Sequence, residues 1–286
     1  MRYLIAGATG YLGGHLVLEM RRRGLDVIAI ARNSEKLKAA GLDAQRCVVA
    51  QVTDPESIHG VCDGIDVVLS TVGITRQKDG LTYMDVDYQA NRNLLKEALR
   101  AGVQKFIYVS VFNGPRLRHL KICEAKERFV DELKQSGMDY TVVRPNGFFS
   151  DMTEFLGMAK RGRIWLFGDG SAKINPIHGA DLAKVCLHAI GTSERETDVG
   201  GLEVFTQKQI AELAFGALDK PPRITRLPTW IRGLPLWSAR TCTSVKAYGP
   251  LEFLLTVTAE DSVAPCFGER LLAECFREYV RSKRWD

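Results

Sequence analysis

A glycine loop near the start of the chain is the first feature that could do chemistry. Three glycines are spaced three residues apart, directly behind the apolar run 3–6 and ahead of a helical stretch with an apolar stripe. Such glycines let the backbone approach a pyrophosphate, whose negative charge the helix N-terminus binds through its unpaired amides and positive dipole. The loop predicts a dinucleotide site, and a tight turn without a ligand is the alternative. The expected phosphate contacts are Gly7, Thr9, Gly10, Tyr11, Leu12 and Gly13.

The residue that selects between NAD and NADP is expected at the end of the second strand. NAD-binding loops have an acidic residue about 20 residues further on, where it accepts hydrogen bonds from the ribose 2'-hydroxyl. This chain has Ala31 and Arg32 there instead. Because a guanidinium pairs well with phosphate, Arg32 predicts NADP(H), and a solvated surface arginine is the alternative.

Three further loops follow strands at the edge where parallel sheets bind ligands. The stretch QVTDPES offers Val52 to the adenine, whereas Asp54 in it is equally suited to cap a helix. STVGI places small residues beside the ribose and pyrophosphate, and RPNGFF places others near the nicotinamide. The contacts predicted from these last two loops are Thr71, Val72, Gly73, Pro145, Gly147 and Phe148.

Lys126 is a charged residue in the middle of an apolar stripe. The helix expected over His119–Gln135 has Ile122, Phe129, Val130 and Leu133 on that stripe, with Glu127 off it. A lysine on a buried face is rare unless it pairs or reaches solvent, so Lys126 predicts a cofactor contact, with snorkelling as the alternative. Ser110, at the carboxyl end of the preceding strand, could hold a substrate or simply start a turn.

These residues need a scaffold that brings strand ends together. Up to about residue 150, short β-branched runs alternate with amphipathic stretches, which predicts an α/β fold with a doubly wound parallel sheet, the Rossmann fold. The expected strands are Tyr3–Ala6, Val27–Ala31, Cys47–Gln51, Val67–Thr71, Phe106–Val111 and Tyr140–Arg144. The expected helices besides His119–Gln135 are Tyr11–Arg23, Ser34–Ala40, Pro55–Val61 and Val86–Ala101.

Beyond residue 150 the pattern loosens and Gly and Pro become more frequent. Helical stretches at Ala180–Ile190, Gln207–Leu218 and Gly268–Arg281 show that this part is folded. We therefore expect a dinucleotide-binding core over 1–150 and a smaller substrate-side lobe over 151–286, interleaved with that core. The segment around Trp230 and Trp237 could be a lid over an apolar substrate, core packing, or a surface for a partner or membrane.

Several motifs in order resemble the atypical and extended branches of the short-chain dehydrogenase/reductase superfamily: GATGYLGG, DVVLSTVG, NRNLLKEALRAGVQKFIYVS, TVVRPNGFF and NPIHGADLA. The last two look closest to the divinyl chlorophyllide reductase-like, isoflavone reductase-like and NmrA-like members. The resemblance implies a Ser that holds the substrate carbonyl, a Tyr that donates a proton, and a Lys four residues later that binds the nicotinamide ribose. Ser110 and Lys126 match, but Ile122 stands where the Tyr is implied. An Asn implied near Asp87 is also lacking, which predicts a weaker polar network there.

Composition and charge exclude several classes of protein. The net charge of +5 comes from 39 basic and 34 acidic residues scattered along the chain, which argues against a nucleic-acid surface. No apolar stretch reaches the ~18 residues of a membrane span. A strand from residue 3 leaves no room for a leader, so we expect a cytoplasmic protein. The cysteines form no Cys-x-x-Cys pair, and we expect no metal.

Two functions remain open. The first is an NADPH-dependent oxidoreductase that passes a hydride to an apolar small molecule, with Lys126 and Ser110 holding cofactor and substrate. Without the Tyr, an enone, quinone or vinyl acceptor fits as well as a ketone. The second is a non-catalytic NADP(H)-binding sensor of the NmrA-like type. The expected partner is a small molecule, with the chain a monomer or homodimer.

Overall fold

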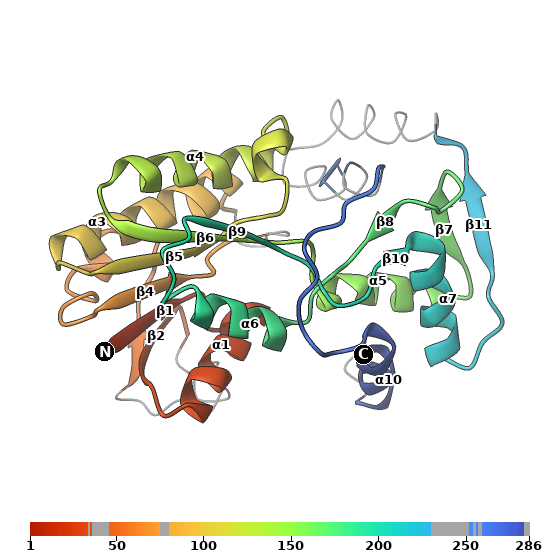
Figure 1. The fold of residues 1–286 in the computed structure, drawn as a ribbon, viewed down its shortest axis with the longest axis horizontal. Helices are drawn as coiled ribbons and strands as arrows, with labels where there is room; N and C mark the ends of the chain where they lie inside the picture. The colour runs from red at the N-terminus through yellow and green to blue at the C-terminus, as the bar shows by residue number, and fades with distance from the viewer. Residues whose placement is uncertain are drawn as a thin grey trace. The chain divides into compact units, whose positions relative to one another are not determined.

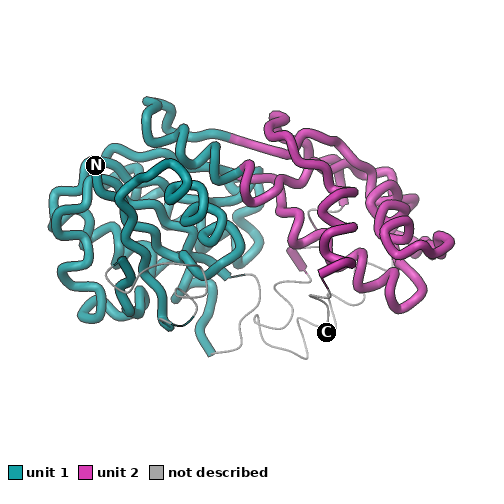
Figure 2. Tube along the Cα trace, turned by 90° about the horizontal axis from the view of Figure 1, so that it is seen from below, with its two compact units in different colours: residues 1–144, 182–197 teal, residues 145–181, 198–286 magenta. Residues whose placement is uncertain are grey.

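The structure is a computed structural model that describes residues 1–33, 35, 46–74, 80–229, 252–253, 256 and 259–282. The segment with Trp230 and Trp237 lies outside the described residues, as does nearly all of the helix expected at Ser34–Ala40. The chain divides into two compact units, which Figure 2 shows in different colours. Unit 1 comprises Met1–Arg144 and Leu182–Thr197, and unit 2 comprises Pro145–Asp181 and Asp198–Asp286.

A seven-stranded sheet forms the centre of unit 1, in the order β3-β2-β1-β4-β5-β6-β9 (Figure 1). Neighbouring strands from β3 to β6 pair in parallel. The order reverses between β1 and β4, which is the switch point of a doubly wound sheet. The predicted Rossmann fold is therefore confirmed. The strands are β1 (Arg2–Ala6), β2 (Asp26–Ala31), β3 (Cys47–Val49), β4 (Val67–Ser70), β5 (Lys105–Val109), β6 (Asp139–Pro145) and β9 (Glu196–Val199).

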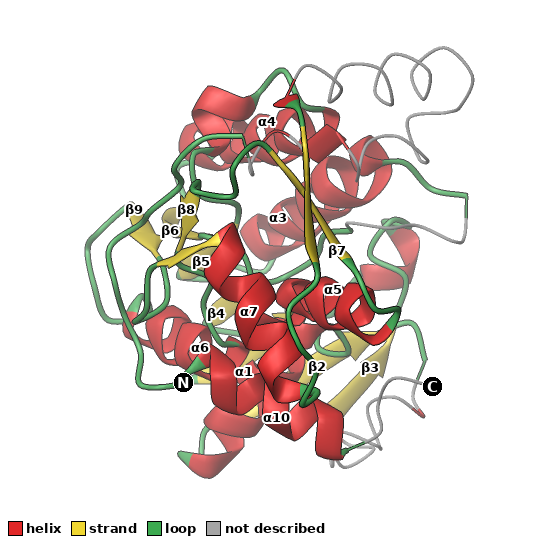
Figure 3. Cartoon of the chain, turned by 90° about the vertical axis from the view of Figure 1, so that its right-hand side faces the viewer, coloured by secondary structure: helices red, strands yellow, loops and turns green. Residues whose placement is uncertain are grey.

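Helices cover both faces of this sheet, as Figures 1 and 3 show. One face carries α1 (Tyr11–Arg22) and α6 (Gly179–His188), and the other carries α3 (Asn91–Arg100) and α4 (Lys121–Gln135). A π-helix, η3 (Met84–Ala90), runs directly into α3. Because both faces are covered, the central strands are mainly apolar, and β5 is buried along its whole length.

Among the described residues of unit 2, three helices and two small sheets form a separate apolar core. The helices are α5 (Phe149–Lys160), α7 (Gln207–Ala217) and α10 (Leu272–Arg281). The sheets pair β8 (Lys173–Ile174) with β10 (Phe205–Thr206) and β7 (Ile164–Phe167) with β11 (Ile224–Leu227). Leu156, Ile210, Phe215 and Phe276 are fully buried in this core.

Some elements differ from the sequence prediction. The helix expected at Pro55–Val61 is a single 3-10 turn, η2 (Glu56–Ile58), because Gly60 adopts a positive φ of 79° and turns the chain. A second 3-10 turn, η4 (Gly114–Leu117), precedes α4. The sequence did not predict β9, α5 or the small sheets. No helix in the described part of the chain is long and apolar enough to cross a membrane.

Candidate active site

The glycine loop joins β1 to α1, and two of its glycines have no room for a side chain. Gly7 adopts φ +84°, and a Cβ there would lie 2.5 Å from Thr71 Oγ1. A Cβ at Gly13 would overlap the Gly7 carbonyl oxygen and lie 2.8 Å from Ala8 Cα. Because these neighbours are mostly backbone, the strand can turn into the helix this tightly only with glycine at both positions.

The N-terminus of α1 is suited to an anion. Its N-cap is Gly10, which supplies no capping side chain, and the first turn holds no acidic residue. By contrast, α7 begins with a capping box from Thr206. Thr9 and Gly10 are exposed, whereas the Leu12 side chain is buried, so a phosphate can meet Leu12 only through its backbone. The amides and dipole of this helix start favour negative charge.

The loop after β4 braces the glycine loop. The Thr71 hydroxyl donates to the carbonyl of Ala6 at 3.1 Å and contacts that of Gly7 at 3.3 Å. Val72 is buried, and Gly73, the next residue, is exposed. The structure therefore brings the two loops together, as expected for neighbouring strands β1 and β4.

The predicted adenine side lies along the same edge of the sheet. Arg32 follows β2 directly and is exposed, and β2 pairs with β1. Val52 follows β3 and is half-buried, with its carbonyl accepting from Asn93 Nδ2 at 3.1 Å. The Asp54 carboxylate accepts the N–H of Glu56 at 3.1 Å. Asp54 therefore caps the turn that follows, which is the alternative that its sequence position allowed.

Lys126 forms an ion pair with Asp87 in the interior of unit 1. Lys126 Nζ lies 2.8 Å from Asp87 Oδ1, and the two side chains are 12% and 0% exposed. Burial alone would lower the pKa of Lys126, but the Asp87 carboxylate outweighs burial and holds that pKa above its ordinary value. Lys126 is therefore charged at neutral pH, and it pairs instead of snorkelling to solvent.

The polar network around Asp87 is stronger than the sequence predicts. The Asn91 side-chain amide donates to the carbonyls of Asp87 at 2.9 Å and Val72 at 3.1 Å. Its oxygen accepts from the Ser70 hydroxyl at 2.5 Å. Asp87 itself accepts the N–H of Ile74 at 3.3 Å. The expectation of a weak network was wrong, because Asn91, one helical turn after Asp87, supplies the amide.

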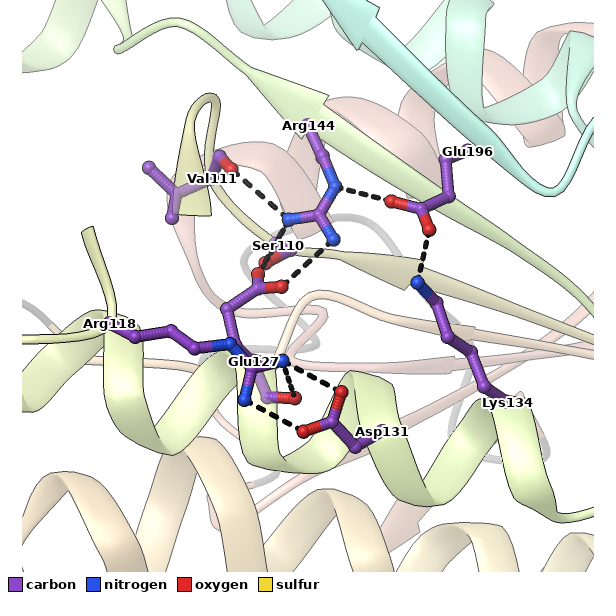
Figure 4. A network of polar contacts seen from close by, with 8 residues as sticks. All are labelled: Ser110, Val111, Arg118, Glu127, Asp131, Lys134, Arg144 and Glu196. Carbon is purple, nitrogen blue, oxygen red and sulfur yellow. Dashed lines mark hydrogen bonds and ion pairs between the residues drawn. The ribbon is translucent and has the colours of Figure 1, made fainter. Parts of the chain in front are cut away.

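Ser110 lies in a second buried network, shown in Figure 4. Its hydroxyl donates to Glu127 Oε1 at 2.8 Å. Arg144 donates to both oxygens of that carboxylate, at 2.5 and 3.0 Å, and to Glu196 at 2.9 Å. The Glu127 and Arg144 side chains are 1% and 3% exposed. The prediction that Glu127 lies off the buried stripe was wrong, because its charge is neutralised inside the fold.

The two catalytic candidates therefore face different partners. Within the described residues, Ser110 contacts Glu127 and Arg144, whereas Lys126 contacts Asp87. Ile122, in the position of the implied Tyr, is 6% exposed and lies one turn before Lys126 on α4. Among the described residues, a phenol that does lie near Lys126 is that of Tyr108 on β5, whose ring centre is 5.8 Å from Nζ.

The residues predicted to contact the nicotinamide belong to unit 2. Pro145 ends β6, and Gly147 adopts a positive φ of 76°. Phe148 is the N-cap of α5, where its N–H donates to Asp151 Oδ2 at 3.1 Å. Their contact with the nicotinamide stays a prediction.

Comparison with known proteins bears on what this edge of the sheet binds. Residues 7–193 match a family model described as NAD(P)H-binding, a span that includes the glycine loop, Arg32 and Lys126. The chain belongs to the NAD(P)H-binding, atypical short-chain dehydrogenase/reductase family. The family binds NAD(P)H, and doubly wound sheets bind such ligands at the carboxyl ends of their strands.

Relatives of this NAD(P)H-binding protein differ in what their names describe. Divinyl chlorophyllide a 8-vinyl-reductase of Zea mays is 26% identical to it over 97% of this chain and 79% of its own. Photosystem II assembly factor Ycf39 of Guillardia theta is 27% identical, over 80% and 74% of the two chains. The NADPH-dependent quinone oxidoreductase QOR2 of Escherichia coli, solved with NADPH, shares the fold with a TM-score of 0.74. It is 18% identical and covers 97% of this chain and 99% of its own.

Proposed function

We propose that this protein is an NADPH-dependent reductase that acts on an apolar small molecule. The observation that carries the proposal is Lys126, which is buried, kept charged by Asp87, and placed beneath the exposed Gly73. Replacing a buried ion pair with apolar residues often leaves the stability of a protein unchanged or raises it. Stability alone therefore does not explain why this chain has the Lys126–Asp87 pair, and a function in binding does. The bound dinucleotide would supply the hydride.

The residues present fit such a cofactor. Gly7 and Gly13 leave no room for side chains, and the start of α1 offers amides without a capping side chain. At Gly73, a Cβ would lie 2.7 Å from both Asp87 Oδ1 and Lys126 Nζ, so a side chain at this position would press on the ion pair. A ribose hydroxyl next to Gly73 could then receive a hydrogen bond from Lys126.

Each part of NADPH has proposed contacts. The phosphates would bind the loop from Gly7 to Gly13, the 2'-phosphate would pair with Arg32, and the adenine would pack on Val52. Thr71, Val72 and Gly73 would line the pyrophosphate and ribose, and Lys126 would bind the nicotinamide ribose. Pro145, Gly147 and Phe148 would lie at the nicotinamide. In domain terms, we propose that 1–150 binds the dinucleotide and 151–286 the substrate.

The missing Tyr indicates the class of acceptor. Ile122 offers no hydroxyl one turn before Lys126, so a ketone would lack its usual proton donor. An enone, quinone or vinyl group fits the site as readily as a ketone does. The name of the Zea mays relative, a vinyl-reductase, supports a carbon–carbon double bond as the acceptor. The Ser110 hydroxyl donates a hydrogen bond to Glu127, and this bond would have to break before Ser110 could donate one to a substrate. We therefore propose that Ser110 supports the site through its network.

A non-catalytic NADP(H) sensor is the second candidate. Two observations favour it: Ile122 in place of the Tyr, and a relative that is named as an assembly factor. In a sensor, the dinucleotide would change the affinity for a partner without being consumed. The two candidates share the dinucleotide site and differ in whether a hydride leaves it.

Turnover separates the two candidates. Purified protein is mixed with NADPH and a panel of enones, quinones, vinyl arenes and ketones, and the loss of NADPH absorbance is followed. We expect reduction of at least one apolar acceptor and its loss in Lys126→Met. Lys121→Met is the matched control, because Lys121 lies on the same helix but is exposed and paired with Glu124. Tight NADPH binding with no acceptor reduced would favour the sensor.

A further inference from the structure

We propose that Asp87 is a positioning residue that keeps Lys126 charged and directed toward the dinucleotide. This inference rests on the proposed function, since it assigns Lys126 to the cofactor. Asp87 touches neither substrate nor cofactor in this proposal and acts only through Lys126.

Three elements meet at the pair. Asp87 lies on η3, Lys126 lies one turn into α4, and the loop after β4 passes over both at Gly73. A Cβ at Gly73 would lie 2.7 Å from each charged atom, so the backbone of this loop lies directly on the ion pair. Gly73 is exposed, whereas the Asp87 side chain is 0% exposed. In this proposal the dinucleotide reaches Lys126 from the side of Gly73, at the carboxyl edge of the sheet, and Asp87 pairs with Lys126 from the protein interior.

Asp87 is the acidic group that faces Lys126 among the described residues; burial raises the pKa of its carboxyl group, and the Lys126 ammonium opposes that rise. The other two titratable groups around the ammonium are Tyr108 on β5 and Cys123 on α4. Burial raises the pKa of both, that of Cys123 to about 12, so both are neutral at neutral pH. Glu127, next to Lys126 in sequence, points its carboxylate at Ser110 and Arg144 instead.

The backbone of η3 holds Asp87 in place. A π-helix has a wider turn than an α-helix, and its junction with α3 leaves carbonyls that need other donors. The Asn91 amide donates to the carbonyls of Asp87 at 2.9 Å and Val86 at 3.3 Å. The N–H of Ile74 donates to Asp87 Oδ2 at 3.3 Å, which leaves Oδ1 for Lys126. Each oxygen of the Asp87 carboxylate thus has its own partner, Ile74 N–H for Oδ2 and Lys126 Nζ for Oδ1.

The test compares Asp87→Asn with the unmodified protein and with Asp85→Asn. Asp85 lies on the same π-helix, but its carboxylate bonds Thr82. NADPH fluorescence gives the Kd from about pH 7 to about pH 10. In Asp87→Asn, burial acts on Lys126 without an opposing charge, so the ammonium loses its proton at lower pH. We expect the Kd of Asp87→Asn to rise by up to about tenfold per pH unit above that pKa. We expect the other two proteins to show little change.

Asp87→Asn with the same pH dependence as the unmodified protein would overturn the proposal, and so would an equal rise in Asp85→Asn. Because the readout is binding, a protein that binds NADPH without turnover refutes the reductase but leaves this test intact.

A second measurement needs neither cofactor nor the Asp87→Asn variant. Lysine labelled with 13C at Cε is titrated by NMR in the unmodified chain, and the Lys126 signal is assigned by its absence from Lys126→Met. We expect Lys126 to lose its proton at higher pH than the exposed lysines. A Lys126 that titrates with the exposed lysines, or below them, contradicts the role of Asp87 even if Asp87→Asn does not fold.

Discussion

Two adjacent glycines in the first turn of α1 should respond to alanine in opposite ways. A Cβ at Gly14 meets no atom within 4 Å, so Gly14→Ala gains helix propensity alone. We expect this variant to be more stable by about 0.5–1 kcal/mol. A Cβ at Gly13 would overlap the Gly7 carbonyl oxygen, 2.7 Å from its carbon, and lie 2.8 Å from Ala8 Cα. Overpacking of this kind costs about 1–3 kcal/mol, because both neighbours are backbone and cannot rotate away.

The same shift of the glycine loop should weaken the cofactor site. Displacing the Gly7 carbonyl also displaces the Gly10 N–H that donates to it at 2.9 Å, and with it the helix start. We expect Gly13→Ala to lose more than about tenfold in NADPH affinity, which is about 1.4 kcal/mol, and Gly14→Ala to lose little. Urea unfolding gives the two stabilities, and NADPH fluorescence gives the two affinities. Equal stabilities and affinities in the two variants would refute the steric argument.

Three further substitutions test separate parts of the account. Arg32→Ala should weaken NADPH binding by about 1.5–3 kcal/mol and NADH binding far less, and an equal loss for both would contradict a 2'-phosphate contact. Ile122→Tyr places a phenol one turn before Lys126, so reduction of ketones should appear or increase; unchanged ketone rates would count against the reading of this position. Glu127→Ala leaves the buried Arg144 without its main partner and should cost about 3–5 kcal/mol in urea unfolding, whereas a loss under about 1 kcal/mol would show that the pair is not structural.

Much of the sheet could be predicted from the sequence. Each of the first six strands is a short β-branched run between turn signals, and their predicted ends agree with the structure to within about two residues. β9 could not be found in this way, because Glu196–Val199 buries a single residue and has no apolar run. Its place in the sheet depends on pairing with β6 at the edge, which local sequence does not encode.

The sequence indicated candidate site residues where a residue type differed from its neighbours, and their contacts with a cofactor stay predictions. Lys126 stood out because a charge interrupts an apolar stripe, and the glycines stood out by their spacing. Asp87 was harder to place, because it lies on a π-helix whose turn differs from the periodicity of 3.6 residues used to assign faces.

Glu127 was misplaced for a related reason. The face of α4 that is buried is wider than one stripe, because this helix packs against η3, η4 and α3. Arg144 carried a signal that pointed to a buried partner: it is a charged residue in the otherwise apolar stretch TVVRP. A charged residue in a buried strand needs a partner of opposite charge, which indicates an acidic residue on a helix that packs against the sheet. The sequence alone does not say which acidic residue this is.

Transfer of the hydride itself tests the central claim most directly. NADPH carrying deuterium on one face of nicotinamide C4 is incubated with the protein and the best apolar acceptor, and the product is analysed by mass spectrometry. A reductase predicts one deuterium in the product from one face of the cofactor and none from the other. NADPH that stays bound and unoxidised, or is oxidised without deuterium reaching the acceptor, would contradict the account.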